Sequence, residues 1–224
     1  MKIRAFCLIS LVGIGILSLI SLPASAADRL LGFQTPTPLP GNVLFQDDFA
    51  TYSNRWSLQD SPKAVTLYRD AALHMRVISP GVSIWSLPDF EVDLKDYGVT
   101  VTVQIAEGSP DSMFGFVFNY RNDENFYALV VSTEGTWQFL RRDKAAWIDL
   151  TPADAKSIGE ILSDSTIYLQ AEAVDNSFTL YVNGMSSGQV FDDTLTSGQF
   201  GLIAMAGKGY IDVSFDNVIM IDIR

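Results

Sequence analysis

Closely spaced carboxylates between residues 91 and 96 are the first feature of the sequence that could support catalysis. This segment reads EVDLKD. Alternate residues of a strand share a face, so Glu91 and Asp93 could stand at the short carboxyl–carboxyl separation that retaining glycoside hydrolysis needs. The next position on that face is Lys95, and Asp96 points to the opposite face of a regular strand. We therefore predict a solvated charged turn here rather than a catalytic pair.

Aromatic and polar side chains are close together in the sequence between residues 121 and 147. Sugars bind proteins by stacking on aromatic faces and by a few directed hydrogen bonds, and this segment supplies both kinds of group. We predict a sugar-binding surface that includes Tyr127, Trp137, Trp147, Arg121, Asn122, Asn125 and Arg141. Tryptophan is usually largely buried, so a core position for Trp137 and Trp147 is the open alternative.

Composition excludes several other kinds of site. The 224-residue chain has one cysteine, Cys7 in an apolar N-terminal run, and one histidine, His74 in a predicted strand. Cys7 lies within the N-terminal segment that we expect to be removed, so a thiol nucleophile and a disulfide framework are excluded for the mature chain. The single histidine excludes a multi-histidine metal site and gives a serine–histidine–aspartate triad little support. The formal net charge of −11 disfavours nucleic acid and anionic lipid headgroups as partners. Neutral ligands, cations and other proteins remain.

The elements that must position these residues are strands. From Gly98 to Arg142, apolar residues alternate with smaller or polar ones, which is typical of strands with one buried face. The breaks GSPDS, RNDEN and STEG contain turn-forming residues, so we expect four strands joined by antiparallel hairpins. Further alternating runs on both sides indicate an all-β, two-sheet antiparallel sandwich.

Two local signals stand outside this alternation. The pair Asn183-Gly184 lies between two predicted strands and favours a type I′ hairpin turn, which needs positive φ at both central positions. Residues 152–162 are the only segment where we predict a short helix, because Thr151 could cap it and Pro152 suits its first position.

The N-terminus is predicted to be processed. Lys2 and Arg4 precede an uncharged apolar run, and Ala24-Ser25-Ala26 has the small residues of a signal-peptidase site. We predict a signal peptide over 1–26, a proline-rich linker over 27–41 and one domain over 42–224. An uncleaved membrane anchor is the alternative. Cleavage removes two positive charges, so the mature chain has a formal charge of −13, and we expect it to be exported to the periplasm or beyond and not bound to a membrane.

Several motifs resemble one known superfamily. The opening LFQDDF, the central FGFVFNYRNDENFYALVVS, the hairpin FTLYVNG, the pair GQFGLIA and the closing FDNVIM are similar to concanavalin A-like lectins and glucanases. Within that superfamily they most resemble laminin-G-like and DUF1080-type domains of exported bacterial proteins. The resemblance covers residues 42–224 and implies a jelly-roll topology for the predicted sandwich. EVDLKD is similar to the E-x-D-x-E strand motif of the glucanase branch, but departs from it at Lys95.

The resemblance also implies a structural calcium site near the paired terminal strands. Asp48 in the first strand and Asp216 in the last are its predicted ligands, with Asp47 and Asp212 close to them in sequence. Calcium takes six to eight oxygen ligands, so backbone carbonyls and water would complete the shell. The alternative is that these aspartates face solvent or bond local backbone amides.

On these grounds we expect an exported, non-catalytic binding module for a glycan or a cell-envelope polysaccharide. Two alternatives stay open. The first is a glycoside hydrolase of the glucanase or DUF1080 type, which needs two carboxylates converging in a cleft. The second is a structural or protein-interaction domain of the envelope.

Export can be tested directly on protein from the native host. Because the small residues before position 27 suit signal peptidase, mass spectrometry should find an N-terminus at Ala27. Recovery of intact Met1 in the membrane fraction would instead establish the uncleaved anchor.

Overall fold

Polar turns divide the segment from Gly98 to Arg142 into the four strands that its alternating apolar and polar residues predict. A computed structural model describes residues 40–51, 55–90, 95–155, 157–159, 161 and 165–223. In it the four strands are β6 (Tyr97–Gly108), β7 (Met113–Asn122), β8 (Asn125–Ser132) and β9 (Trp137–Asp143). Strands β7, β8 and β9 pair antiparallel, as expected. The expected hairpin between β6 and β7 is wrong, because this connection crosses between two sheets and the apolar faces of the two strands pack against each other.

The other described strands extend both sheets. They are β1 (Asn42–Asp47), β2 (Gln59–Asp60), β3 (Ala64–Arg69), β4 (Ala72–Val77), β5 (Ser83–Ser86), β10 (Ala146–Asp149), β11 (Thr166–Val174), β12 (Ser177–Val182), β13 (Met185–Phe191), β14 (Gln199–Met205) and β15 (Ile211–Asp222).

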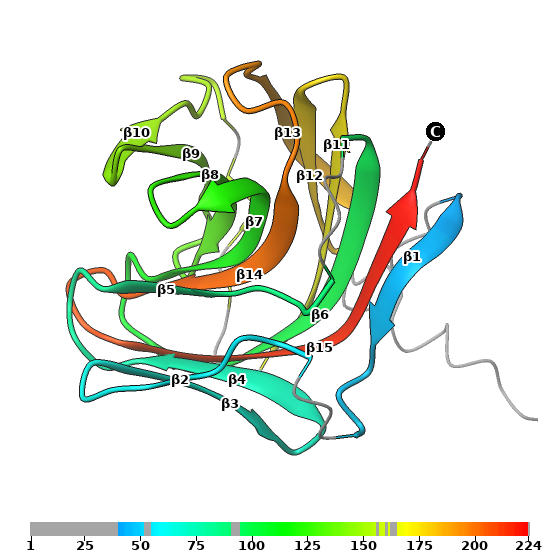
Figure 1. Cartoon of the computed structure of the whole chain (residues 1–224). Helices are drawn as coiled ribbons and strands as arrows, with labels where there is room; N and C mark the ends of the chain where they lie inside the picture. The colour runs from blue at the N-terminus through cyan, green and yellow to red at the C-terminus, as the bar shows by residue number, and fades with distance from the viewer. Residues whose placement is uncertain are drawn as a thin grey trace, which may run out of the picture. The chain divides into compact units, whose positions relative to one another are not determined.

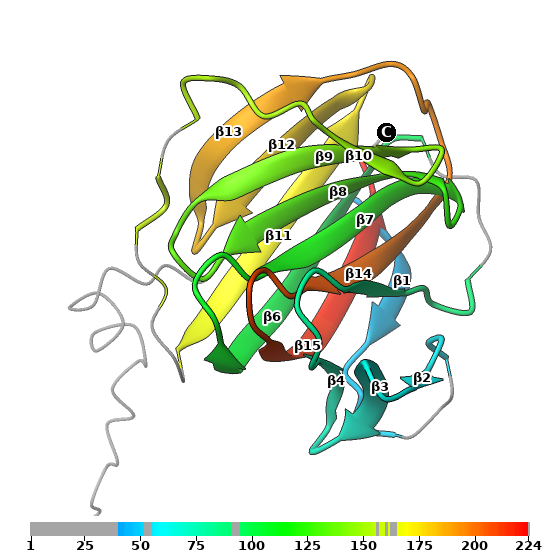
Figure 2. The ribbon, with the colours of Figure 1, turned by 90° about the vertical axis from the view of Figure 1, so that its left-hand side faces the viewer.

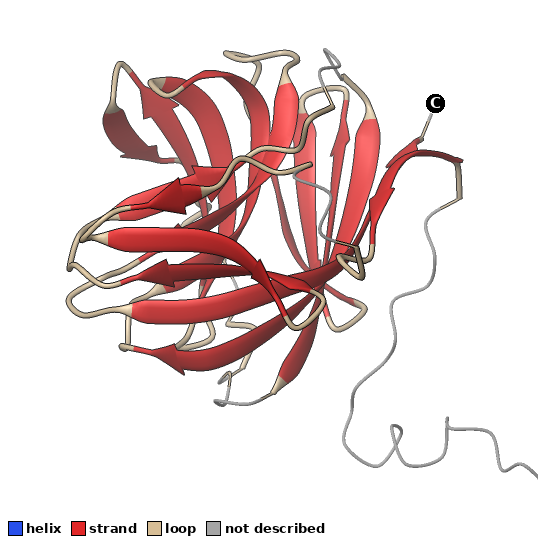
Figure 3. Ribbon diagram, turned by 60° about the horizontal axis from the view of Figure 1, so that its bottom comes forward, coloured by secondary structure: helices blue, strands red, loops and turns tan. Residues whose placement is uncertain are grey.

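The strands form two antiparallel sheets. The nine-stranded sheet runs in the order β13-β12-β11-β6-β15-β4-β3-β2, with β1 paired to β15, and the six-stranded sheet runs β10-β9-β8-β7-β14-β5 (Figure 1). Figure 2 shows β10, β9, β8, β7 and β14 side by side in front of strands of the nine-stranded sheet. Figure 3 shows that the described residues are strands and loops. The predicted all-β, two-sheet antiparallel sandwich is therefore confirmed.

Side chains from both sheets fill the space between them. Phe116 and Phe118 of β7 point into this space and are fully buried. The ring of Phe178 on β12 lies 4.8 Å from that of Phe139 on β9 and 5.8 Å from that of Phe118, measured between centroids. These contacts join the two sheets, and burying each such ring stabilises the fold by about 1.5–3 kcal/mol.

The segment after β10 is not the predicted helix. Its described residues between 152 and 161 are turn or irregular. The backbone N–H of Ile158 and the hydroxyl of Ser157 both donate to the carbonyl of Gly135, each at 2.9 Å. The segment thus bonds to the β8–β9 turn through Ile158 and Ser157, while the Ala155 N–H closes a local turn onto the Pro152 carbonyl at 3.0 Å.

The predicted signal peptide and residues 27–39 of the predicted linker lie outside the described residues. Within the described part of the chain, no helix could cross a membrane.

The turn between β12 and β13 has the predicted geometry. Asn183 has a φ of 50° and Gly184 a φ of 78°, so both central residues have the positive φ of a type I′ turn. The Asn183 side chain also accepts a hydrogen bond from the Tyr168 backbone N–H at 2.9 Å, which joins the turn to the start of β11.

Substitution of Gly184 tests this turn. Gly184→Val should lower the free energy of unfolding by about 1–3 kcal/mol, because a β-branched residue is strained at positive φ. Met185→Val, at the exposed next residue, is the matched control and should change it little. Equal urea midpoints for the two variants would contradict the assigned turn.

Candidate functional site

The outward face of the six-stranded sheet is buried although it lies opposite the inter-sheet core. Successive side chains of each strand point to opposite faces of the sheet. In β8, Tyr127 and Leu129 therefore point inward, while Phe126, Ala128 and Val130 point outward. All three outward residues have no exposed surface. Partly buried side chains pack against them, namely Trp85, Leu87, Met113, Tyr120, Trp147 and Met205. The outward face therefore carries a second hydrophobic cluster.

Aromatic rings surround Phe126 at the centre of this cluster. Trp85 on β5 lies 4.9 Å from Phe126 between ring centroids, Trp147 on β10 lies 5.5 Å away and Tyr120 on β7 lies 5.7 Å away. Trp147 meets Phe126 edge to face, at an interplanar angle of 89°. We call these four residues the aromatic face. Three of its rings are only partly buried, so they present apolar surface that a ligand could cover.

One arginine and one aspartate fix the orientation of these rings. The Arg142 guanidinium lies 5.0 Å from the Trp147 ring centroid and 5.6 Å from that of Trp85, and its Nε donates to the Asp123 carbonyl at 2.8 Å. The Asp123 carboxylate accepts from Trp85 Nε1 at 3.1 Å and from the Tyr120 hydroxyl at 2.7 Å. Burial, then the bond to Asp123, raises the pKa of Tyr120 to about 12, so this hydroxyl stays a neutral donor at physiological pH.

A pocket of about 570 Å³ continues the aromatic face beyond β5. Trp85, Tyr120 and Asp123 line it and also belong to the arrangement just described. Its other lining residues include the hydroxyl-bearing Ser57, Ser61 and Ser83, with Gln59 and Lys63. The combination of apolar ring surface with several polar groups is typical of small-molecule and sugar sites.

Some of the predicted site residues lie at this face. Trp147 belongs to the aromatic face itself. Asn122 and Asn125 bond each other in the β7–β8 turn, where Asn125 Nδ2 donates to Asn122 Oδ1 at 2.9 Å. Their contact shapes the turn that holds Asp123. Arg121 is exposed beside this turn and donates to the Ser197 hydroxyl at 2.6 Å.

Other predicted site residues lie on the opposite side of the six-stranded sheet. Tyr127 has no exposed surface and Trp137 is 3% exposed, and both belong to the inter-sheet core. The expectation that their rings form an exposed stacking surface with Trp147 is therefore wrong. They occupy the inward positions of β8 and β9, whereas Phe126 and Arg142 occupy neighbouring outward positions. Because both faces of β8 are buried, its central residues are apolar throughout, and the sequence does not indicate which of them point inward and which outward.

Arg141 is also directed inward and takes part in a structural ion pair. Its Nη1 lies 2.7 Å from Asp192 Oδ2 and also donates to the Thr194 hydroxyl. The Tyr127 hydroxyl donates to the other carboxylate oxygen of Asp192. Burial alone would raise the pKa of Asp192, but hydrogen bonds from Tyr127 and Thr194 and the charge of Arg141 outweigh it and hold this pKa below its usual value. This network fastens the β13–β14 connection to β8 and β9.

The predicted calcium ligands make local hydrogen bonds. Asp48 accepts from the Ala50 N–H at 3.1 Å, and Asp216 accepts from the Asn217 backbone and side chain at 2.6 and 2.7 Å. Burial raises the pKa of Asp216, and the charges of Asp48 and Asp47 raise it further. No cluster of three or more His, Cys, Asp or Glu side chains suited to a metal occurs among the described residues. Calcium binding here stays a prediction.

The candidate catalytic segment is described only at its end. Glu91 and Asp93 lie outside the described residues. Asp96 accepts a hydrogen bond from the Asp175 backbone N–H at 2.9 Å. Lys95 Nζ lies 3.9 Å from the Asp175 carboxylate. Asp96 therefore bonds to the β11–β12 turn.

Several residues of the aromatic face were missed by the sequence reasoning, namely Trp85, Tyr120, Phe126, Arg142 and Asp123. A usable signal was present in the apolar run from Phe126 to Val131. An uninterrupted apolar strand is typical of burial on both faces, so it indicated a covering layer on the outward side.

The Asp192 network predicts a pH-dependent loss of stability. Asp192→Asn should lower the free energy of unfolding by roughly 3 kcal/mol at neutral pH, because Arg141 keeps its buried charge without a partner. The contribution of a carboxyl with a lowered pKa is complete above its unfolded pKa of about 4 and is lost as the pH falls through its folded pKa. The difference from wild type should therefore shrink below pH of about 4. Asp193→Asn, at the exposed neighbour, is the control in urea titrations, and equal losses for both variants would contradict the assignment.

Solved structures share this architecture. The carbohydrate-binding module CBM66 from Bacillus subtilis matches with a TM-score of 0.57 and 16% identity, over 83% of this chain and 100% of that one. The Bacillus licheniformis beta-glucanase matches with a TM-score of 0.58 and 10% identity, over 82% and 99%. A Bacillus subtilis protein of unknown function with a galectin-like fold matches with a TM-score of 0.56 and 14% identity, over 81% and 96%.

No protein-family model matches the chain, and no curated protein sequence does. At identities this low, the structural matches establish the fold alone. They include a binding module and a glucanase, so the shared fold does not distinguish binding from hydrolysis. They confirm the two-sheet jelly-roll fold that the sequence motifs imply, whereas the likeness to laminin-G-like and DUF1080-type domains stays a prediction. The described domain has the concanavalin A-like jelly-roll fold.

Proposed function

We propose that the protein is an exported, non-catalytic module that binds a neutral glycan on the aromatic face. A polysaccharide of the cell envelope is the proposed ligand class. The observation that carries this proposal is the set of partly exposed rings around the fully buried Phe126, on the sheet face opposite the inter-sheet core.

The geometry of the rings suits sugar stacking. Trp85 and Trp147 both contact Phe126 and both lie within cation–π distance of Arg142, so their positions are set before a ligand arrives. A preorganised aromatic surface binds a sugar with little loss of side-chain entropy. The aliphatic C–H face of a pyranose or furanose ring would then displace water from apolar ring surface.

Polar groups beside the rings can form directed hydrogen bonds that would orient a bound sugar. Asp123 has acceptor capacity beyond its bonds to Trp85 and Tyr120, because an ionised carboxylate has about four lone-pair sites. In the adjoining pocket, the hydroxyls of Ser57 and Ser83 can take part in hydrogen bonds to a ligand, whereas that of Ser61 is engaged with the Ala64 backbone. The strongly negative net charge disfavours an acidic polysaccharide, which supports a neutral glycan as ligand.

The carboxylates near the aromatic face favour binding over hydrolysis. Glycoside hydrolysis uses two carboxyl groups across the scissile bond. Asp123 is the one acid among the residues described as lining the 570 Å³ pocket, and it already accepts hydrogen bonds from two aromatic side chains. A single acid committed to orienting rings supports a recognition role.

Alanine substitution of the two tryptophans tests the proposal. A glycan array of neutral polysaccharides identifies the ligand, and calorimetric titration measures affinity. Trp85→Ala and Trp147→Ala should each weaken binding by about 1–3 kcal/mol through lost stacking area. Both rings also cover Phe126, so each variant should lose stability as well, and affinity is compared at a temperature where thermal unfolding shows every variant folded. Phe191→Ala removes an exposed ring elsewhere and is the matched control.

Two results would contradict this function. Absence of binding to every glycan would favour the structural or protein-interaction alternative. Release of reducing sugar by the wild-type protein, abolished in Glu91→Ala, would favour the hydrolase alternative.

A further inference from the structure

The 570 Å³ pocket beside the aromatic face has an apolar part. Leu58 lines it and keeps 41% of its surface exposed. Val82 and Leu87 also line it, and they pack against the inter-sheet core and the outer cluster respectively. Trp85 belongs both to this pocket and to the aromatic face. An exposed leucine in a pocket gains from contact with an apolar group, which the hydroxyls of a plain sugar do not supply.

Hydrogen bonds fix the backbone at Leu58. The Ser57 N–H donates to the Leu87 carbonyl, and the Leu87 N–H donates to the Ser57 hydroxyl, each at 2.9 Å. The Ser86 hydroxyl donates to the Ser57 carbonyl at 2.7 Å. These three bonds tie the residue before Leu58 to the end of β5, so this side of the pocket is ordered before a ligand arrives.

Two charged side chains of the pocket each bond in one direction only. Asp123 accepts from Trp85 and Tyr120 through Oδ1, and no described side chain or backbone group donates to its Oδ2. An ionised carboxylate only accepts, so this oxygen suits a ligand N–H or O–H. Lys63 also lines the pocket, and because an ammonium group only donates, it suits a carbonyl oxygen.

We propose that this pocket binds the acetamido group of an N-acetylated amino sugar. The inference rests on the proposed function and names the class of neutral glycan that the aromatic face binds. The acetamido N–H donates to Asp123 Oδ2, its carbonyl accepts from Lys63, and its methyl group covers Leu58. A hydroxyl at the same carbon of the sugar has neither a carbonyl nor a methyl group, so it leaves Leu58 exposed to water.

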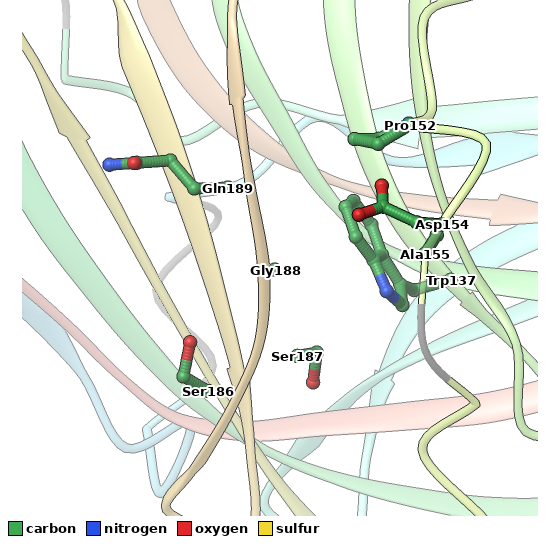
Figure 4. Close-up of a pocket in the computed structure, with 8 residues that line it drawn as sticks. All are labelled: Trp137, Pro152, Asp154, Ala155, Ser186, Ser187, Gly188 and Gln189. Atoms are coloured by element: carbon green, nitrogen blue, oxygen red, sulfur yellow. The ribbon is translucent and has the colours of Figure 1, made fainter.

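Another pocket in the described part of the chain differs in each of these respects. It has a volume of about 240 Å³ and lies beside Trp137, whose ring is 3% exposed and offers little stacking surface. Its lining contains no lysine and no leucine. Figure 4 shows the Trp137 nitrogen at the end of the ring away from the Asp154 carboxylate. Asp154 therefore provides a control carboxylate in a pocket outside the aromatic face.

Chitotetraose and cellotetraose form a matched pair of probes. They share one linkage and differ only in the acetamido group that replaces one hydroxyl on each ring. Calorimetric titration of the wild-type protein should show chitotetraose binding about tenfold more tightly or better, as one further hydrogen bond to a charged group provides. Trp85→Ala should weaken binding of both probes, because both stack on the aromatic face.

Two variants change the proposed contacts and keep the rings. Leu58→Asn removes the apolar surface. Asp123→Asn keeps an oxygen for the two ring donors but places an NH₂ group at Oδ2, from which a hydroxyl can accept and to which an N–H cannot donate. Each should lower the ratio of the two affinities toward one. Leu67→Asn, at an exposed position on β3, and Asp154→Asn are the matched controls and should keep the ratio.

The outcomes separate this inference from the function on which it rests. Equal affinities for the two probes, both lowered in Trp85→Ala, would overturn the inference and leave the proposed function standing. A ratio that Leu58→Asn and Asp123→Asn do not change, or a tightest array ligand without acetamido groups, would have the same consequence. Absence of binding to every glycan, or binding that neither Trp85→Ala nor Trp147→Ala alters, would instead overturn the proposed function itself.

Discussion

Burial of β8 on both faces is the constraint on which the rest of this structure depends. Because successive side chains of a strand point to opposite faces, the run from Phe126 to Val131 sends one half of its side chains into the inter-sheet core and the other half outward. The inward half packs against the nine-stranded sheet and stabilises the sandwich. The outward half needs a cover of its own, and Trp85, Tyr120 and Trp147 supply it. The surface proposed to bind a glycan is thus the cover of a strand that has no polar face.

The same alternation explains what could be predicted from the sequence. Period-2 patterning identified the central strands, and Asn183-Gly184 identified its turn, because both signals are local. The sheet to which β6 belongs and the irregular path of the described residues after Pro152 depend on contacts distant in sequence. For the site, proximity in sequence placed Tyr127 beside Trp147, although strand geometry puts them on opposite faces. Trp85 is far from both in sequence and joins the aromatic face only through β5 at the sheet edge.

The stabilising network and the proposed recognition surface therefore lie on different sides of one sheet. On the inward side, Arg141 and Asp192 are mostly buried and hydrogen-bonded to Tyr127 and Thr194, an arrangement that fixes the connection after β13. On the outward side, Arg142 lies over two tryptophans and contacts the turn at Asp123. The adjacent residues Arg141 and Arg142 of β9 thus point to opposite faces of the sheet. Arg141 stabilises the fold, and Arg142 lies beside the proposed ligand surface.

A crystal structure of the protein with the tightest glycan found in an array tests the central claim most directly. The account predicts a sugar ring stacked on Trp85 or Trp147, with a hydroxyl within hydrogen-bond distance of Asp123, and little movement of Phe126 or Arg142 from their positions here. A glycan seated instead on the outer side of the nine-stranded sheet, with the aromatic face empty, would contradict it.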